Sequence, residues 1–109
     1  MAVFKKLTIY LDENEYLGNQ PLYKEVLEFL RDQGIKGATV FKGVFGWGPD
    51  GVVHTVNLLR AASNLPLKIE IIERVEVLEK IIPRLKKMIP KGLITLAEVE
   101  VLFSSNGKL

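Results

Sequence analysis

The sequence predicts a single domain of the α+β class, in which an antiparallel sheet carries two helices on one face. Four short segments are expected to be strands, of which two alternate apolar and polar residues and another is rich in β-branched and aromatic residues. Two longer segments have apolar residues three and four positions apart, as amphipathic helices do. The chain has 109 residues, of which 48% are hydrophobic, so it can form one core over residues 1–109.

The N-terminal part predicts a strand followed by a helix. Apolar residues alternate with polar ones over residues 5–11, which indicates a strand with one apolar face. After a polar loop, Asn19 can cap a helix and Pro21 suits its first turn. We therefore expect a helix over residues 20–33, ended by Gly34.

The middle of the chain is a strand that runs into a glycine-rich loop. Residues 37–42 are rich in β-branched and aromatic side chains, which favours a strand. The loop, residues 46–64, is expected to be flexible and contains Trp47 and His54, the only tryptophan and the only histidine. It is either a long hairpin connection or a binding loop. Residues 52–62 could continue the hairpin or form a short helix.

The C-terminal part predicts strand, helix and strand. Residues 67–72 alternate as a strand, and residues 73–88 have one apolar stripe at helical spacing. Pro83 falls inside this stripe and is expected to kink or divide the helix. Residues 93–103 form the last expected strand, and residues 104–109 look like a frayed tail.

The element order is therefore β-α-β-β-α-β, which is the ferredoxin-like arrangement. Both helices then cover one face of the sheet, and alternate strand residues form the opposite face. An apolar face without cover favours a partner, so we expect a homo-oligomer. The residues expected on this open face include Tyr10, Phe41, Ile72, Ile94 and Leu96.

Composition excludes several classes of function. The absence of cysteine excludes disulfides, thiolate metal sites and a thiol nucleophile, and one histidine is weak support for a metal site. No apolar run approaches the roughly 18 residues of a membrane span, and the N-terminus does not look like a signal peptide. We expect a cytoplasmic protein. The net charge of +2 does not favour nucleic-acid binding.

Several segments together resemble the PII family of trimeric signalling proteins. They are GATV at residues 37–40, GWG at residues 46–48, then His54, Arg60, LKIEII at residues 67–72, and a turn containing Gly92 before the last strand. The sequence is most similar to the PII-like family catalogued as domain of unknown function one-ninety, and the resemblance covers nearly the whole chain.

The resemblance implies a homotrimer that binds adenine nucleotides in clefts between subunits and moves the loop at about residues 46–64 in response. Such proteins are regulators of target proteins, membrane transporters among them, and are not enzymes. No obligatory cofactor or metal is implied. The residues that would line the nucleotide site are Gly37, Ala38 and Thr39 from one subunit, Gly46, Trp47 and Gly48 from the adjoining one, and also Ile72 and Gly92.

Two departures from the PII pattern concern the phosphates of the nucleotide. PII proteins have a lysine directly after the glycine of the last turn, where this chain has Leu93. They also carry two arginines beyond the last strand, where this chain has serine and asparagine at residues 104–106. With fewer cations for the terminal phosphates, we expect AMP or ADP to bind more tightly than ATP. Lys42, His54 and Arg60 are candidate phosphate contacts.

Other functions remain open at this point. A small trimeric enzyme could act on a small acid or a phosphate compound, with His54 and Arg60 in the cleft between subunits. Glu98 and Glu100 lie two residues apart and could be paired carboxylates, although a solvent-facing edge explains them as well. A metal-sensing trimer is disfavoured by the absence of cysteine.

Overall fold

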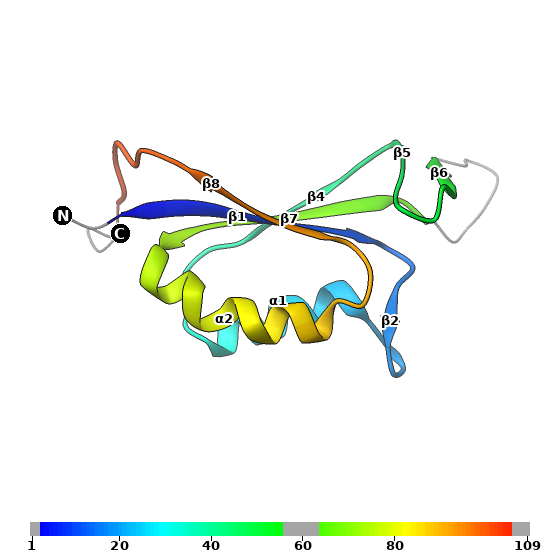
Figure 1. Cartoon of the computed structure of the whole chain (residues 1–109), viewed down its shortest axis with the longest axis horizontal. Helices are drawn as coiled ribbons and strands as arrows, with labels where there is room; N and C mark the ends of the chain where they lie inside the picture. The colour runs from blue at the N-terminus through cyan, green and yellow to red at the C-terminus, as the bar shows by residue number, and fades with distance from the viewer. Residues whose placement is uncertain (1–2, 56–63, 106–109) are drawn as a thin grey trace.

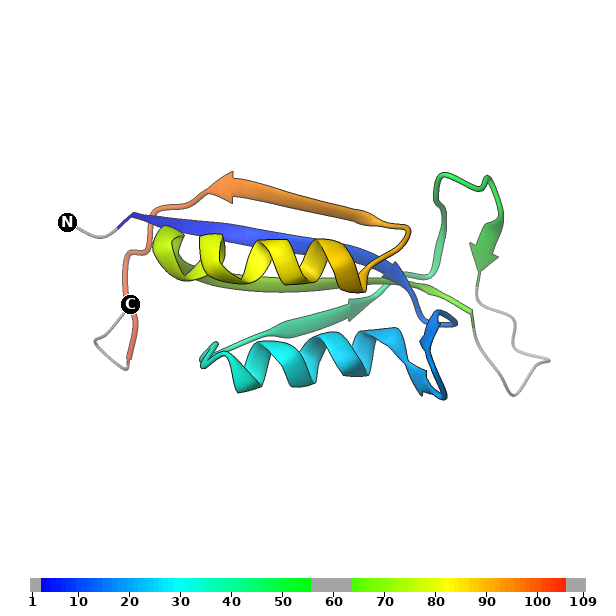
Figure 2. The ribbon, with the colours of Figure 1, turned by 60° about the horizontal axis from the view of Figure 1, so that its bottom comes forward.

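The computed structural model describes residues 3–55 and 64–105. Its main feature is an antiparallel sheet of four strands in the order β4-β7-β1-β8. Two helices lie side by side on one face of this sheet (Figures 1 and 2). The predicted α+β, ferredoxin-like order of elements is thereby confirmed. The bounds are β1 (Phe4–Asp12), α1 (Leu22–Asp32), β4 (Thr39–Lys42), β7 (Pro66–Arg74), α2 (Val75–Met88) and β8 (Leu93–Glu98).

The core lies between the sheet and the two helices. β1 pairs with β7 along its whole length, from Phe4 opposite Arg74 to Asp12 opposite Pro66. The alternate residues of both strands face the helices, and burial of each large aliphatic side chain stabilises the fold by roughly 1.5–3 kcal/mol. The fully buried residues are Leu7, Ile9, Ile69 and Ile71 from the strands, Leu22, Val26 and Leu30 from α1, and Leu78, Ile81 and Leu85 from α2.

The first helix begins two residues later than the sequence predicts. A small hairpin precedes it, in which β2 (Tyr16–Leu17) pairs with β3 (Gln20–Pro21). No side chain caps the helix, so the expectation that Asn19 is the cap is wrong. Instead, the backbone N–H of Leu22 donates a hydrogen bond to the carbonyl oxygen of Glu15, 2.7 Å away. The carbonyl group of Glu15 thus accepts a hydrogen bond from the first turn of the helix, a role that a capping side chain would otherwise have.

The second helix also starts two residues late, because Glu73 and Arg74 continue β7. It then runs without interruption to Met88. Pro83 therefore does not divide the helix, although proline removes one backbone donor from it. Neither helix in the described part of the chain is long and apolar enough to cross a lipid bilayer.

The last strand ends at Glu98, five residues before the predicted end. Its final pair joins Glu98 to Lys5, close to the point where β1 begins at Phe4. Residues 99–103 alternate like a strand in the sequence but lie outside the sheet. A strand needs a neighbour for its backbone groups, and β1 offers none beyond this point.

The register of β8 corrects part of the predicted open face. Ile94 lies opposite Ile9 and Leu96 opposite Leu7, so both belong to the face that carries the helices. Ile94 also packs against the core. The prediction for these two residues is wrong, and the open-face position belongs to Leu93, which lies opposite Tyr10. Tyr10, Phe41 and Ile72 do lie on the open face, where each is 42–45% exposed.

The glycine-rich loop begins as a second small hairpin, in which β5 (Phe45–Trp47) pairs with β6 (Val53–Thr55). This hairpin stands at the end of the sheet away from the N-terminus (Figure 2). The start of the ambiguous segment 52–62 therefore continues the hairpin. The remainder of the loop at residues 56–63 and the tail at residues 106–109 lie outside the described residues.

Candidate functional site

Two cavities lie at opposite ends of β4. The first, here called the hairpin cavity, has a volume of about 460 Å³ and lies where the β5–β6 hairpin faces the turn before β8. The second, here called the strand cavity, has a volume of about 370 Å³ and lies at the start of β4 beside β7. The hairpin cavity is lined by Tyr10, Leu11, Asp12, Glu15, Trp47, Gly48, Pro49, Asp50, Pro66, Leu67, Lys91, Gly92 and Leu93. The strand cavity is lined by Lys36, Gly37, Ala38, Thr39, Glu70, Ile71 and Ile72.

One wall of the hairpin cavity is a tight turn at the tip of the hairpin. The backbone N–H of Gly51 donates to the carbonyl oxygen of Gly48 at 2.9 Å, and Gly51 has φ +73°. Asp50 stabilises the same turn, because its Oδ1 accepts a hydrogen bond from the backbone N–H of Val52 at 2.9 Å. An aspartate bonded to the backbone two residues later is a common turn device. The Asp50 carboxylate is therefore held in place by its own loop.

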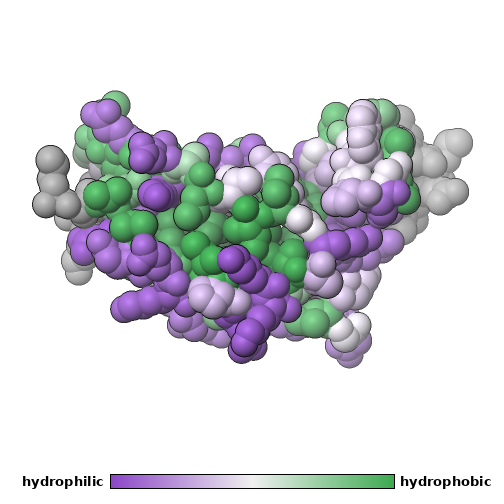
Figure 3. Space-filling view, in the orientation of Figure 1, coloured by the Kyte–Doolittle hydropathy of each residue, from purple (hydrophilic) through white to green (hydrophobic). Residues whose placement is uncertain are grey.

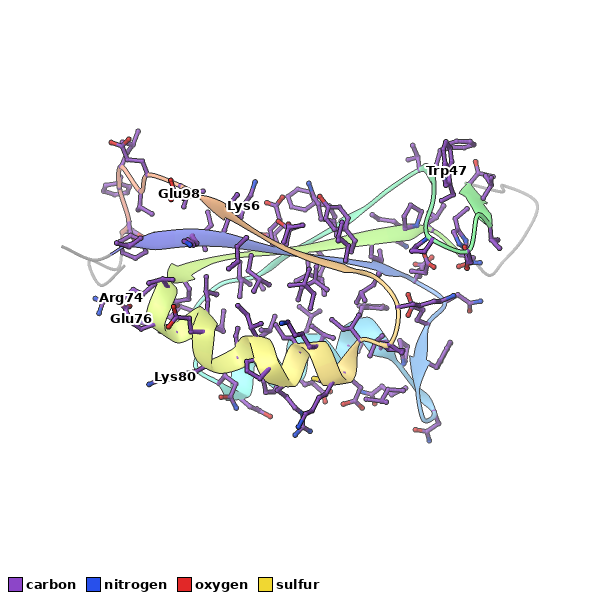
Figure 4. All side chains as sticks on the ribbon, viewed as in Figure 1. Lys6, Trp47, Arg74, Glu76, Lys80 and Glu98 are labelled. Carbon is purple, nitrogen blue, oxygen red and sulfur yellow. The ribbon has the colours of Figure 1, made fainter. Side chains whose placement is uncertain are left out.

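The hairpin carries two exposed aromatic side chains. Trp47 is 66% exposed and meets Phe45 edge to face, with ring centroids 6.1 Å apart. Figure 4 shows Trp47 on the side of the sheet opposite the helices. An exposed tryptophan at the edge of a cavity can stack on a flat ring or contact another subunit.

The opposite wall is the turn Lys91–Gly92–Leu93 at the start of β8. The Nζ atom of Lys91 lies 3.2 Å from Oδ2 of Asp50, so an ion pair joins the two walls. The hydrogen bond from Val52 and the contact with Lys91 lower the pKa of Asp50 below its usual value of 3.8. The same hydrogen bond with Asp50 raises the pKa of Lys91 above 10.5. Both groups are therefore charged at neutral pH.

Carboxylates dominate the charge of the hairpin cavity. Asp12, Glu15 and Asp50 line it, and Lys91 is the one cation among the lining residues that the structure describes. The backbone N–H of Asp12 donates to Oε1 of Glu15 at 2.9 Å, which orients that carboxylate. This charge balance favours a ligand with little negative charge, or one whose anionic group meets Lys91.

His54 lies beside this cavity and is not one of its lining residues. Its side chain is 7% exposed, and its Nε2 lies 3.5 Å from Oδ2 of Asp12. Neither ring nitrogen has a hydrogen-bond partner within the described part of the chain. The side chains of His54 and Asp12 are therefore close enough to interact electrostatically, but they do not form a hydrogen bond.

The residues that the sequence predicts for a nucleotide site separate into two groups. Trp47, Gly48 and Gly92 line the hairpin cavity. The other group lines the strand cavity and consists of Gly37, Ala38, Thr39 and Ile72. Gly46 lines neither cavity and lies near the ring of Pro66. The site residues predicted from the sequence therefore lie at both ends of β4.

The three candidate phosphate contacts have different positions. Lys42 lines neither cavity, and its Nζ lies 2.6 Å from Oε2 of Glu13, which raises the pKa of the lysine. His54 is buried, and Arg60 lies outside the described residues. Sequence reasoning missed Asp50 and Lys91. The available signal for Lys91 was its position directly before Gly92.

Exposed apolar surface continues beyond the two cavities. Figure 3 shows apolar atoms gathered over β8 and the adjoining part of α2. Leu93 and Leu96 of β8 are 56% and 42% exposed.

Among residues 3–55 and 64–105, no three histidine, aspartate or glutamate side chains are placed to hold a metal ion.

Comparison with known families gives a match over nearly the whole chain. Residues 4–101 match DUF190, the family described as "Uncharacterized ACR, COG1993". A UPF0166 protein of Aquifex aeolicus is 36% identical over 105 residues, covering 94% of this chain and 99% of that protein. A UPF0166 protein of Methanocaldococcus jannaschii is 36% identical over 102 residues, covering 93% and 94% of the two chains.

Two solved structures share the fold. CPII from Thiomonas intermedia K12, solved bound to ADP and bicarbonate, has a TM-score of 0.61 and 20% identity over 90% of this chain and 87% of that one. The divalent ion tolerance protein CutA1 from Ehrlichia chaffeensis has a TM-score of 0.64 and 11% identity over 97% and 90%. At these identities the likeness concerns the fold, which is the ferredoxin-like arrangement of two helices on an antiparallel sheet.

Proposed function

The chain belongs to DUF190, and from this membership and its PII-like fold we propose that it is a non-catalytic regulatory protein that binds an adenine nucleotide between the subunits of a homotrimer. The observation that carries the proposal is the separation of the expected site residues into two cavities at opposite ends of β4. In a closed ring, each subunit meets its neighbour through two different surfaces. The hairpin cavity of one subunit can then face the strand cavity of the next.

The lining of the hairpin cavity suits part of a nucleotide. Its volume of about 460 Å³ lies in the range of small-molecule sites. Trp47 offers an aromatic surface, and Leu11, Leu67 and Leu93 offer apolar contacts for a base or ribose. The CPII structure holds ADP, and this makes adenine nucleotides the first ligands to test.

The charges of the cavity support a preference for AMP or ADP over ATP. Each further phosphate adds negative charge near Asp12, Glu15 and Asp50, and Lys91 is the one cation among the described residues that line the hairpin cavity. Like charges close together in a partly enclosed site repel. The absence of arginine at residues 104–106 points in the same direction.

We infer that nucleotide binding changes the shape that the loop presents to a target protein. The loop that begins with the β5–β6 hairpin adjoins the cavity and carries exposed side chains, including Phe45 and Trp47. Differential binding to two loop arrangements would make the level of the nucleotide control the target. A cytoplasmic protein whose target is a membrane transporter fits this role.

Isothermal titration with AMP, ADP and ATP in parallel tests ligand binding. We expect about one nucleotide per chain, as one cleft per subunit requires, and weaker binding for ATP. Tighter binding of ATP would contradict the charge argument. No binding of any of the three would contradict the proposed function.

Mixed trimers test the position of the site between subunits. Trp47→Ala removes a contact from the hairpin cavity, and Ile72→Ala removes one from the strand cavity. If each variant alone fails to bind, random mixing of the two should restore about a quarter of the sites, because that share of interfaces combines two intact cavities. A site within one subunit would not be restored at all.

A further inference from the structure

The ion pair between Asp50 and Lys91 is the link between the two walls of the hairpin cavity. The two residues are 41 positions apart in the chain and belong to the hairpin tip and to the turn before β8. Their side chains are 37% and 54% exposed. An ion pair in contact with water is weak and easily broken, because solvent screens the attraction and each partner can interact with water instead.

The two partners differ in how firmly they are held. Asp50 is fixed to its own turn by the hydrogen bond from Val52. Lys91 carries its charge on a flexible stem with three donors, so its ammonium can move to another anion. The backbone beneath it is fixed, because Gly92 packs against the carbonyl oxygen of Tyr10.

Lys91 is also placed to meet a phosphate. It lines the cavity beside Trp47 and Gly48, the residues expected to contact the nucleotide. The remaining charged groups of the lining are Asp12, Glu15 and Asp50, which repel an anion. A phosphate in this cavity therefore has Lys91 as its partner among the described lining residues, and that partner is already paired with Asp50.

We propose that a nucleotide phosphate and the Asp50 carboxylate compete for Lys91, so that phosphate binding releases the β5–β6 hairpin from the turn before β8. The inference rests on the proposed function and gives it a mechanism. Once Lys91 has moved to the phosphate, the Asp50 carboxylate faces a second anion without its counter-ion. Repulsion then moves the hairpin tip away. Adenosine has no phosphate and leaves the ion pair intact.

The test combines titration with hydrogen exchange on Asp50→Asn and Lys91→Gln. AMP and adenosine differ only in the phosphate, so the difference between their complexes isolates its effect. In the wild type, we expect amides of residues 43–55 to exchange faster in the AMP complex than in the adenosine complex. In Lys91→Gln, this difference should vanish, and AMP affinity should fall by about tenfold or more, since a hydrogen bond to a charged group is lost. Asp50→Asn should bind AMP more tightly, because the competing carboxylate is gone.

Two remote substitutions serve as matched controls. Asp32→Asn and Lys24→Gln remove the same charges from exposed positions of α1, and both should leave AMP binding and exchange unchanged. No binding of AMP or adenosine to the wild type would overturn the proposed function and this inference together. Binding of AMP with equal affinity by the wild type, Lys91→Gln and Asp50→Asn would overturn the competition alone. Equal exchange in the AMP and adenosine complexes of the wild type would overturn the release of the hairpin.

Discussion

Gly92 and Tyr10 are in contact so close that a Cβ on residue 92 would lie 2.5 Å from the carbonyl oxygen of Tyr10. Gly92 also has φ +145°, a conformation that residues with a side chain rarely adopt. Both features explain why residue 92, in the turn that carries Lys91, is glycine. We predict that Gly92→Ala lowers the free energy of unfolding by about 1–3 kcal/mol through backbone strain, measured by urea denaturation.

Gly37→Ala is the control for this prediction. No heavy atom lies within 4 Å of a Cβ on residue 37, and its φ is not in the left-handed region. We expect this substitution to change stability by less than about 0.5 kcal/mol, as for most surface positions. Equal losses in the two variants would mean that neither the φ of Gly92 nor its contact with Tyr10 sets the cost.

The sequence predicts the sheet well where alternation is unambiguous. The strands at residues 5–11 and 67–72 each agree with the structure to within two residues at either end. The prediction of which β8 residues lie on the open face is wrong because Leu93 and Ile94 are adjacent and both apolar. Alternation therefore fits either face. The choice is made by pairing with β1, which places Ile94 opposite the buried Ile9.

The candidate site shows a similar limit. Gly92 was selected through the resemblance to the PII family, and the structure shows why glycine is needed there, because a Cβ on residue 92 would meet the carbonyl oxygen of Tyr10. The ion pair between Asp50 and Lys91 joins residues that no local pattern connects. Likewise, the pairing of Lys42 with Glu13 depends on how the loop after β1 folds beside β4. Contacts between segments that are distant in the sequence can be predicted only once the fold is known.

The open face of the sheet predicts a homo-oligomer, and the resemblance to the PII family implies a homotrimer, which would have a mass of about 37 kDa because one chain has a mass of 12.3 kDa. Phe41 is 45% exposed on this face, and Nζ of Lys68 lies 4.8 Å from the centre of its ring. We predict that Phe41→Asp gives a monomer, because the interface loses an aromatic ring and gains a charge. Lys68 can pair with the new carboxylate, so the subunit itself should stay folded. Light scattering measures the mass.

Leu17→Asp is the matched control for the open face. Leu17 is 46% exposed, about the same as Phe41 at 45%, but it lies in β2 outside the four-stranded sheet. We expect this variant to keep the mass of the wild type. A wild-type mass of 12.3 kDa, or dissociation by both variants, would refute the assignment of the interface.

His54 separates the regulatory function from the enzymatic alternative. Its ring is buried beside Asp12, and it does not line the hairpin cavity. We predict that the wild type releases no phosphate from AMP, ADP or ATP. We also predict that His54→Ala lowers the free energy of unfolding by about 1–3 kcal/mol, because a buried side chain is removed. Phosphate release by the wild type that disappears in a folded His54→Ala variant would instead favour an enzyme.

The ion pair between Asp50 and Lys91 should break in acid. The folded state lowers the pKa of Asp50 below 3.8, so the stabilisation is complete above that value and is lost as the pH falls through the pKa of the folded state. The raised pKa of Lys91 keeps the lysine charged up to at least pH 10.5 and does not affect the acid limit. We predict that the fluorescence of Trp47 changes with a midpoint below pH 3.8, before the far-ultraviolet circular dichroism is lost.

Asp50→Asn identifies the group responsible for this acid transition. Asp12 and Glu15 line the same cavity, and His54 lies beside Asp12, so Asp50 is not the only ionisable group near Trp47. The asparagine variant keeps these groups and can still accept the hydrogen bond from Val52, but it has no charge for Lys91. The transition below pH 3.8 should therefore be absent from the variant. If it persists there, Asp50 does not hold the hairpin against the turn before β8.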